Sequence, residues 1–330
     1  MALAQELRSC LTLPAFAAPM FLCSGVDLAV ASCKAGIIGS LTRNHCRDLA
    51  ELGAQLKAVR EALSRFSDTH PDRKVGPLAV NISPTFSTEE FQENLQVCAR
   101  YGARIIVTSV GDPTKNAPVV RDAGLLHFHD ATTIRFAEKA AAANVDGIVC
   151  IGAGGGGRAG TVSHLAFIPI VRDMFDGTIV LAGAVSTGAV IRAAEVLGAD
   201  LAYIGTRMIA TKEAMAPEAY KAMLVEGGVG DVIYTSTVKG MPASWLKASL
   251  RRVGLDPENL PPHPGVSDLP EGKTPWRDVW SGGQGVGLIK DIPMVEELVH
   301  RLQEEYIAAC AISDMADAAR DALGNRWSYD

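Results

Sequence analysis

The sequence predicts an α/β protein that forms a closed (β/α)8 TIM barrel with a C-terminal lid-like insertion and extra helices. Two observations support this fold class. Short apolar runs alternate with helix-length amphipathic segments, and eight such runs occur, which is the strand count of this barrel. Most of the runs are almost entirely apolar, as expected where helices cover both faces of a parallel sheet. An open doubly wound sheet, which usually has fewer strands, is the alternative.

The predicted elements follow one another in regular order. The expected strands are 14–20, 36–40, 78–82, 104–109, 125–129, 146–151, 178–182 and 201–205. The expected helices are 24–34, 45–66, 87–101, 115–123, 132–143, 163–175 and 187–197. Helical periodicity returns at 293–307, where a last helix would close the outer ring.

The length of the chain fits one enlarged barrel. The 330 residues exceed the roughly 250 of a typical barrel. Residues 211–291 are rich in Pro, Gly and Trp and carry few strand signals, so we expect a lid or substrate wall there. The barrel would comprise 1–210 and 292–312. The tail, 313–330, would be surface helix or a subunit contact, and the apolar C-terminal helices allow a homodimer.

Composition excludes several classes of protein. Apolar residues make up 48% of the chain and charged residues 21%, which is ordinary for a globular enzyme and not for a disordered chain. The formal charge of −6 argues against a nucleic-acid partner. No apolar stretch is long enough to predict a membrane span. The seven cysteines include no CxxC pair, so we expect no metal site and a cytoplasmic protein with reduced thiols.

The glycine-rich stretch at 146–160 is the most prominent motif. It contains GxGxxG at Gly152, Gly154 and Gly157, directly after a predicted strand. A dinucleotide-binding fold would place this motif after its first strand and an acidic residue at the end of the next one. Here the motif follows the sixth strand, and the next strand ends in Ala-Gly-Ala-Val. We therefore predict a backbone that approaches a flat or anionic group, with a flexible surface loop as the alternative.

Two further loops lie where barrels bind phosphate. The seventh strand ends at Gly183, and the eighth ends in Gly205-Thr206-Arg207. Glycine N–H groups and the Thr206 hydroxyl can form a phosphate cup. Arg207 either adds charge to this cup or forms a structural ion pair behind it.

Together these stretches resemble the nitronate monooxygenase (2-nitropropane dioxygenase-like) family of FMN-dependent barrels. The matching segments are 18–20, 81–83, 146–160, 181–183, 198–214 and 281–285. The resemblance implies an FMN cradle. Pro19 and Met20 would lie behind the isoalloxazine, Asn81 at its polar edge, and Gly156 and Gly157 against the cofactor. Gly183, Gly205 and Thr206 would hold the phosphate, Gln284 would approach from the lid, and Asp146 and Ala184 are further candidates for cofactor binding. Asn81 as a strand-end turn former and Gln284 as an ordinary loop amide are the alternatives.

Two positions depart from the family pattern. The family usually reads Ala-Gly-Gly-His-x-Gly, with the histidine as catalytic base, and this chain has Arg158 there. A guanidinium stays protonated and has no acceptor lone pair, so it cannot take a proton from substrate. The lysine often found after strand five is replaced by Asp130.

Acid–base work would then pass to other residues. His129, beside Asp130 at a strand end, and His164, after the glycine loop, are the candidates together with Arg158 as a substrate-binding group. His129 could equally be structural, and a surface position at a helix start is the simpler interpretation of His164. His127, deeper on the same strand, is better explained as a core histidine.

The sequence supports three functional hypotheses. The first is an FMN-dependent oxidoreductase that oxidises alkyl nitronates with O2. The second keeps FMN but uses NAD(P)H as electron donor, or acts on an activated C=C bond such as an enoyl thioester. The third is a flavin-free sugar-phosphate aldolase or isomerase, disfavoured because no strand end offers a lysine. A catalytically inactive binding barrel is a further alternative.

Overall fold

The chain folds into a closed eight-stranded parallel barrel, as the sequence predicts. The computed structural model describes residues 5–238, 240, 242–261 and 269–311. The barrel strands are β1 (Ala15–Ala17), β2 (Gly39–Thr42), β3 (Leu78–Asn81), β4 (Ile105–Ser109), β5 (Leu126–Ala131), β6 (Gly147–Ile151), β7 (Thr178–Ala182) and β8 (Leu201–Ile204). Their order is β1-β8-β7-β6-β5-β4-β3-β2, and a parallel bridge from Phe16 to Ile38 closes the ring.

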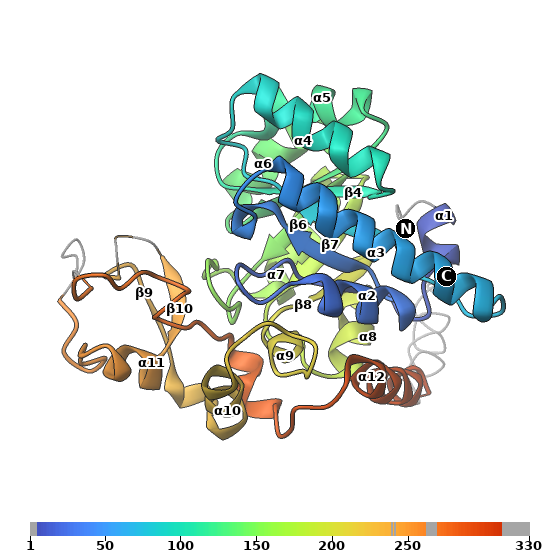
Figure 1. Cartoon of the computed structure of the whole chain (residues 1–330). Coiled ribbons are helices and arrows are strands. Elements are labelled where there is room, and N and C mark those ends of the chain that lie inside the picture. Colours follow the sequence, from blue (N-terminus) through green and yellow to red (C-terminus); the bar gives the residue numbers. More distant parts are fainter. Residues whose placement is uncertain (1–4, 239, 241, 262–268, 312–330) are drawn as a thin grey trace, which may run out of the picture.

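A ring of helices covers the outside of the barrel (Figure 1). It is formed by α2 (Val26–Lys34), α3 (Leu49–Thr69), α4 (Thr88–Arg100), α5 (Asn116–Asp122), α6 (Ile134–Ala142), α7 (His164–Met174), α8 (Gly188–Leu197) and α12 (Val295–Cys310). The last of these packs against α8 and α2 and takes the eighth place in the ring. The prediction that the 293–307 periodicity closes the ring is therefore confirmed.

The barrel interior is filled by side chains. Phe16 lies 4.7 Å from Tyr203 and 6.4 Å from Phe128 between ring centroids, which forms an aromatic layer across the axis. Leu7, from the short helix α1 (Gln5–Ser9), joins this cluster and covers the amino-terminal end of the barrel. The interior is thus a packed core, and only the carboxyl-terminal end of the strands is left to carry a site.

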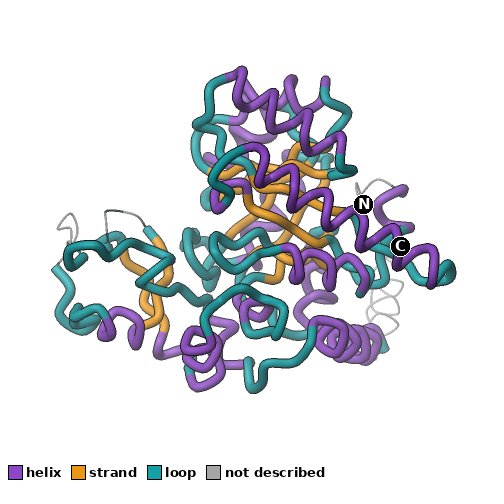
Figure 2. Tube along the Cα trace, in the orientation of Figure 1, coloured by secondary structure: helices purple, strands orange, loops and turns teal. Residues whose placement is uncertain are grey.

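The segment between β8 and α12 forms a lobe beside the barrel, and this lobe contains a hairpin that the sequence signals did not predict (Figure 2). Its elements are α9 (Thr206–Ile209), α10 (Glu218–Glu226), β9 (Val232–Thr235), β10 (Ala243–Leu246) and α11 (Lys247–Arg252). The buried side chains of Trp245, Val279 and Leu250 give the lobe a small core of its own. The predicted tail, 313–330, lies outside the described residues.

Among the described residues, no helix is long and apolar enough to cross a membrane, and no three His, Cys, Asp or Glu side chains are grouped as a metal site.

The packing of α8 against α12 depends on Gly188. A Cβ at this position would collide with the backbone of Leu302 and Tyr306. We therefore expect Gly188→Ala to lower the free energy of unfolding by about 1–3 kcal/mol, as overpacking usually does. Urea denaturation would measure this. Gly230→Ala is the control, because an added Cβ there meets nothing within 4 Å; equal effects of the two changes would contradict the explanation.

Candidate functional site

The loop that follows β6, residues 152–160, crosses the carboxyl-terminal end of the barrel in direct contact with other backbone. A Cβ on Gly160 would collide with the carbonyl of Thr132, and the Gly160 amide donates to the carbonyl of Ile151 at 3.0 Å. Gly154 and Gly157 have φ angles of +86° and +63°, which side chains disfavour. The glycines are therefore required by close approach, and the flexible-loop alternative does not describe this segment.

The segment 281–285 clamps this loop from the C-terminal part of the chain. The Gln284 amide donates to the carbonyl of Gly154 at 2.9 Å, and the Gly283 amide donates to the Thr206 hydroxyl oxygen at 2.9 Å. A Cβ on Gly156 would lie 2.9 Å from both the Gly283 nitrogen and Thr206 Oγ1. The loops after β6 and β8 and the returning chain thus meet at one place.

The loops after β7 and β1 reach the same place. A Cβ on Gly183 would lie 3.0 Å from the Gly155 nitrogen, and the next residue, Ala184, has a φ of +57°. On the other side, Met20 Sδ lies 3.9 Å from the Cβ position of Gly205. A non-glycine residue in the left-handed region is uncommon and often marks a functional loop.

The structure brings most of the predicted cofactor residues together at this end. Met20, Gly156, Gly183, Gly205, Thr206 and Gln284 are linked by the contacts above, Gly157 and Ala184 lie within the same loops, and Pro19 precedes Met20. Asn81 also ends its strand here, with its amide donating to the carbonyl of Val107 at 3.1 Å.

Asp146 does not join this group. It stands before β6, at the amino-terminal end of the barrel, where its carboxylate accepts a hydrogen bond from the His127 amide at 2.8 Å. The expectation that Asp146 lies at a cofactor site is therefore not met by the geometry, because the residue precedes the strand and the glycines follow it.

His129 and its neighbours on β5 show which side chains enter the barrel. Phe128 belongs to the interior cluster, and side chains alternate along a strand, so His127 and His129 point outward. The Thr108 hydroxyl lies 2.7 Å from His127 Nε2 and 2.7 Å from His129 Nδ1, beneath the helices. Burial lowers the pKa of His127 to about 3 and that of His129 to about 4. His129 is thus a buried structural group, and the expectation that it faces the reacting centre is not met.

Asp130 takes the inward position instead. It follows Phe128 by two residues, and its Oδ1 atom is buried without a hydrogen-bond partner. Burial raises the pKa of this carboxyl to about 7. The hydroxyl of Tyr203, on β8, is also buried without a partner inside the barrel. Neither Asp130 nor Tyr203 was among the predicted site residues, although the alternation of side chains along β5 and β8 shows that both point into the barrel.

The His164 side chain packs between the glycine loop and the end of β7. Its Nε2 donates to the carbonyl of Ala182 at 2.8 Å, and a Cβ on Gly152 would lie 2.8 Å from this nitrogen. Burial lowers the pKa of the imidazole, and the hydrogen bond to Ala182 opposes part of that shift. The ring is engaged between the loops after β6 and β7, which corrects the interpretation of a surface position.

Arg158 lies at the edge of the site under the lobe. The side chain is exposed, and its guanidinium carbon lies 5.7 Å from the centre of the Trp276 ring. On either side of it, Ser244 donates its amide to Gly157 at 2.8 Å, and Tyr234 donates its hydroxyl to the Ala159 carbonyl at 3.0 Å. The hairpin β9–β10 thereby holds the residue that carries the positive charge.

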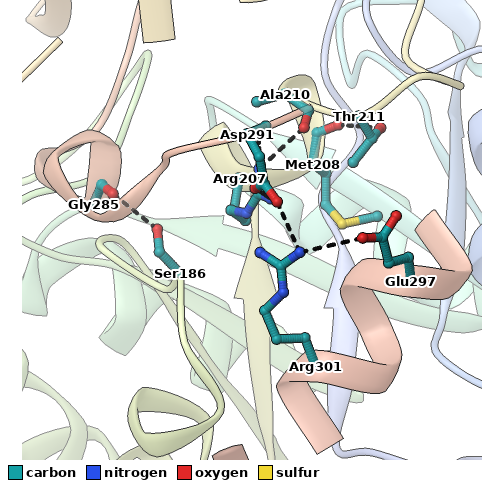
Figure 3. Close-up of polar contacts among 9 residues, drawn as sticks. All are labelled: Ser186, Arg207, Met208, Ala210, Thr211, Gly285, Asp291, Glu297 and Arg301. Carbon is teal, nitrogen blue, oxygen red and sulfur yellow. Dashed lines mark hydrogen bonds and ion pairs between the residues drawn. The ribbon is translucent and has the colours of Figure 1, made fainter. Parts of the chain in front are cut away.

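Arg207 is a structural group, which settles the alternative left open by the sequence. It is buried, and it donates to Asp291 Oδ1 at 2.7 Å and to the Ala210 carbonyl at 3.0 Å (Figure 3). Arg301 of α12 donates to the other carboxylate oxygen of Asp291 at 2.7 Å. Asp291 therefore connects the end of β8 to the last ring helix, away from the phosphate cup.

The cradle fits a flat phosphorylated cofactor such as FMN. Glycine backbone of three loops packs closely at this end of the barrel, and the predicted phosphate-binding residues belong to the loops after β7 and β8. Asp130 and Tyr203 each have a buried polar atom without a hydrogen-bond partner, and both residues point into the barrel. A bare apolar pocket would offer neither feature.

Removing Asp291 should loosen the lobe and the last helix together. We expect Asp291→Ala to lower the free energy of unfolding by about 2 kcal/mol, because the buried Arg207 loses a charged hydrogen-bond partner. Glu296→Ala, which removes an exposed ion pair with Arg73, is the matched control and should cost less than about 1 kcal/mol. Thermal unfolding of both variants would decide, and a control loss as large as the Asp291 loss would contradict the assignment.

The buried histidines predict a defined acid sensitivity. Their pKa values lie below the ordinary value of 6.5, so the unfolded chain binds more protons and stability is lost as the pH falls from about 6.5 towards 4. At pH 5 this costs about 2 kcal/mol for each histidine. His129→Gln should therefore lose less stability than the wild type between pH 7 and pH 5 in urea titrations.

The exposed His70 at the end of α3 provides the control for this measurement. His70→Gln should follow the wild-type pH dependence. An unchanged pH dependence in His129→Gln would show that His129 is not held neutral by burial.

Comparisons with known proteins agree with this fold and identify the family. The family model for nitronate monooxygenase matches residues 7–261. The nitronate monooxygenase of Neurospora crassa is 26% identical over 337 residues, covering 87% of each chain. An octahydro-indene-carboxyl-CoA dehydrogenase of Mycobacterium tuberculosis is 26% identical over 230 residues, covering 69% of this chain and 61% of that protein.

Solved structures share the whole architecture. A nitroalkane oxidase from Streptomyces ansochromogenes superposes with a TM-score of 0.74 at 23% identity, covering 93% of this chain and 99% of that one. FabK from Thermotoga maritima gives a TM-score of 0.70 at 21% identity, covering 96% and 98%. At these identities the likeness concerns the fold, and the family model extends over more than half of the chain. The chain belongs to the nitronate monooxygenase family and is a flavin-dependent oxidoreductase.

Proposed function

We propose that this chain is an FMN-dependent oxidoreductase that oxidises alkyl nitronates with O2. The observation that carries this proposal is the cation at position 158. Arg158 is an exposed residue of the glycine loop, and its guanidinium carbon lies 5.7 Å from the centre of the Trp276 ring in the lobe. A substrate that enters between loop and lobe would meet this positive charge.

A guanidinium suits an anionic substrate with two oxygens. Its planar N–H groups can bind both oxygens of a nitro, nitronate or carboxylate group at once. A nitronate has already lost its α-proton, so its oxidation needs no base at the outset. Arg158 cannot serve as that base, because it has no acceptor lone pair. The substrate class and the residue thus agree with each other.

The cofactor would be held by the strand-end residues described above. Gly183, Gly205 and Thr206 would bind the phosphate, Met20 and Gly156 would border the ring, and Asn81 would hydrogen-bond its polar edge. FMN, when bound, supplies the redox chemistry by accepting electrons from the substrate and passing them to O2. The chain's own residues would bind and orient the substrate and the cofactor and would exclude water from the site.

Spectroscopy and substrate choice test this function directly. The purified protein, supplied with FMN, should show the flavin absorbance bands near about 370 and 450 nm. With flavin bound, turnover of an alkyl nitronate should exceed turnover of the matching neutral nitroalkane, which needs a base. Equal rates on the two substrates would contradict the role given to Arg158.

Changing Arg158 should separate substrate binding from cofactor binding. We expect Arg158→Leu to raise the KM for the nitronate at least about tenfold, the cost of one charge-assisted hydrogen bond, with FMN affinity unchanged. Arg158→His should gain turnover of the neutral nitroalkane, because imidazole can accept the proton. Steady-state rates and FMN fluorescence titration measure the two effects; a parallel loss of FMN affinity would mean that Arg158 supports the cofactor.

A second candidate is an NAD(P)H-dependent reductase or dehydrogenase that acts on an activated C=C bond or an enoyl thioester. The specific support is the lobe, which holds Arg158 and provides a wall for a larger substrate. The carboxyl-CoA dehydrogenase among the relatives is consistent with it. Anaerobic mixing with NADH and NADPH distinguishes the two, since rapid flavin bleaching favours this second candidate.

A further inference from the structure

The inside of the barrel carries two polar groups that the proposed substrate chemistry leaves unused. Asp130 Oδ1 and the Tyr203 hydroxyl are buried without hydrogen-bond partners among the described residues. Each would cost about 1–3 kcal/mol if it stayed unsatisfied. Native structures keep such groups where a ligand or a reaction needs them.

The two groups lie in one part of the barrel. Asp130 is paired in register with Ser109 on β4 and Val149 on β6, and it follows the buried aromatic layer of Phe128 towards the carboxyl-terminal end. Tyr203 is the last inward residue of β8 and packs edge-on against Phe16. Burial raises the pKa of the Tyr203 hydroxyl, and the charge of Asp130 adds to that shift.

Few other ionisable groups surround this carboxyl. The inward residues of the neighbouring strands are Ser109 on β4, Val149 and Ile151 on β6, and Asn81 on β3, none of which carries a charge. His129 is adjacent in sequence but faces the helices. Tyr203, which stays neutral, is the titratable neighbour inside the barrel. Burial alone holds the pKa of Asp130 at about 7, within the working range of an enzyme.

We propose that Asp130, assisted by Tyr203 within the same barrel interior, holds a proton for the bound cofactor, taking it up when negative charge arrives at the barrel mouth and releasing it when that charge leaves. This rests on the proposed function, because the charge is that of the reduced cofactor. The two residues act through the barrel interior, and Arg158 acts from the lobe. They are positioning residues for charge and do not attack the substrate.

The proton and electron balance is simple. FMN, when bound, would gain one negative charge on taking up two electrons from the substrate together with one proton. The added negative charge favours the neutral form of a nearby carboxyl, so the Asp130 carboxylate binds a second proton from solvent. Reoxidation by O2 removes the electrons, and Asp130 releases its proton. Above about pH 7, the wild type should thus take up one more proton per electron pair than a variant without this carboxyl.

The first test uses the protein without cofactor. Between about pH 4 and pH 7 the folded chain holds a proton that the unfolded chain has lost, so the buried Asp130 lowers stability as the pH rises. Asp130→Asn should raise the melting temperature relative to the wild type, and the gain should be clearly larger at pH 8.5 than at pH 5.5, because the penalty grows until about pH 7. The exposed Asp173 on α7 supplies the control, since Asp173→Asn should shift both equally. An Asp130→Asn shift that is the same at both pH values would overturn the proposal.

The second test uses the FMN-loaded protein and measures the reduction potential against a reference dye from pH 6 to 9. For a two-electron couple, one additional proton steepens the slope by about 30 mV per pH unit. The wild type should show this steeper slope above about pH 7, and Asp130→Asn should not. Tyr203→Phe should shift the pH at which the slope changes while keeping the additional proton. Equal slopes in the wild type and Asp130→Asn would overturn the proposal.

The two tests separate this inference from the proposed function. If FMN binds and the slopes agree, the proton-holding role of Asp130 is wrong while the flavin enzyme stands. If the protein binds no FMN, the proposed function and this inference both fail, and the melting measurements still report whether Asp130 holds a buried proton.

Discussion

The site depends on backbone that packs directly against backbone at residues 152–160. Gly160 fits under the Thr132 carbonyl only without a Cβ, and Gly156 lies against Gly283 and Thr206 for the same reason. Side chains at these points would separate the loops after β6 and β8 from the returning segment 281–285. A surface without side chains follows, as needed where a flat cofactor approaches. The glycines are therefore a packing requirement, and under the proposed function they would also border the cofactor.

The lobe is fixed to this loop by two kinds of contact. Hydrogen bonds from Ser244 and Tyr234 hold the far side of the glycine loop, and Asp291 ties the end of the insertion to β8 and α12 (Figure 3). The buried Arg207 forms an ion pair with Asp291 in this second contact, so its charge stabilises the fold. Arg158, in contrast, keeps an exposed face beside Trp276. The two arginines thus differ in burial: Arg207 serves the packing of the fold, and Arg158 is the cation on which the proposed function rests.

Most of the fold could be predicted from hydrophobic periodicity. All eight strands and the ring helices follow from apolar runs, because parallel strands buried on both faces leave a clear pattern. The hairpin β9–β10 gave no such signal, since its strands lie in a small lobe and Val232, Ile233 and Tyr234 are only partly covered. At the site, the glycine positions were predictable from their motif. The direction of His129 was missed because the prediction used nearness to a strand end and did not apply the two-residue alternation from Phe128.

The alternation of side chains along β5 also explains why its histidines and its aspartate lie in different surroundings. One step along β5 moves a side chain from the helix layer, where Thr108 bonds two neutral histidines, to the barrel axis, where Asp130 lies without a hydrogen-bond partner for one oxygen. The axis then carries an acid with a pKa near 7, while Arg158 belongs to the glycine loop and lies beside Trp276 of the lobe. Under the proposed function, charge gained by a ligand in the cradle would be stabilised by the Arg158 cation and by proton uptake at Asp130.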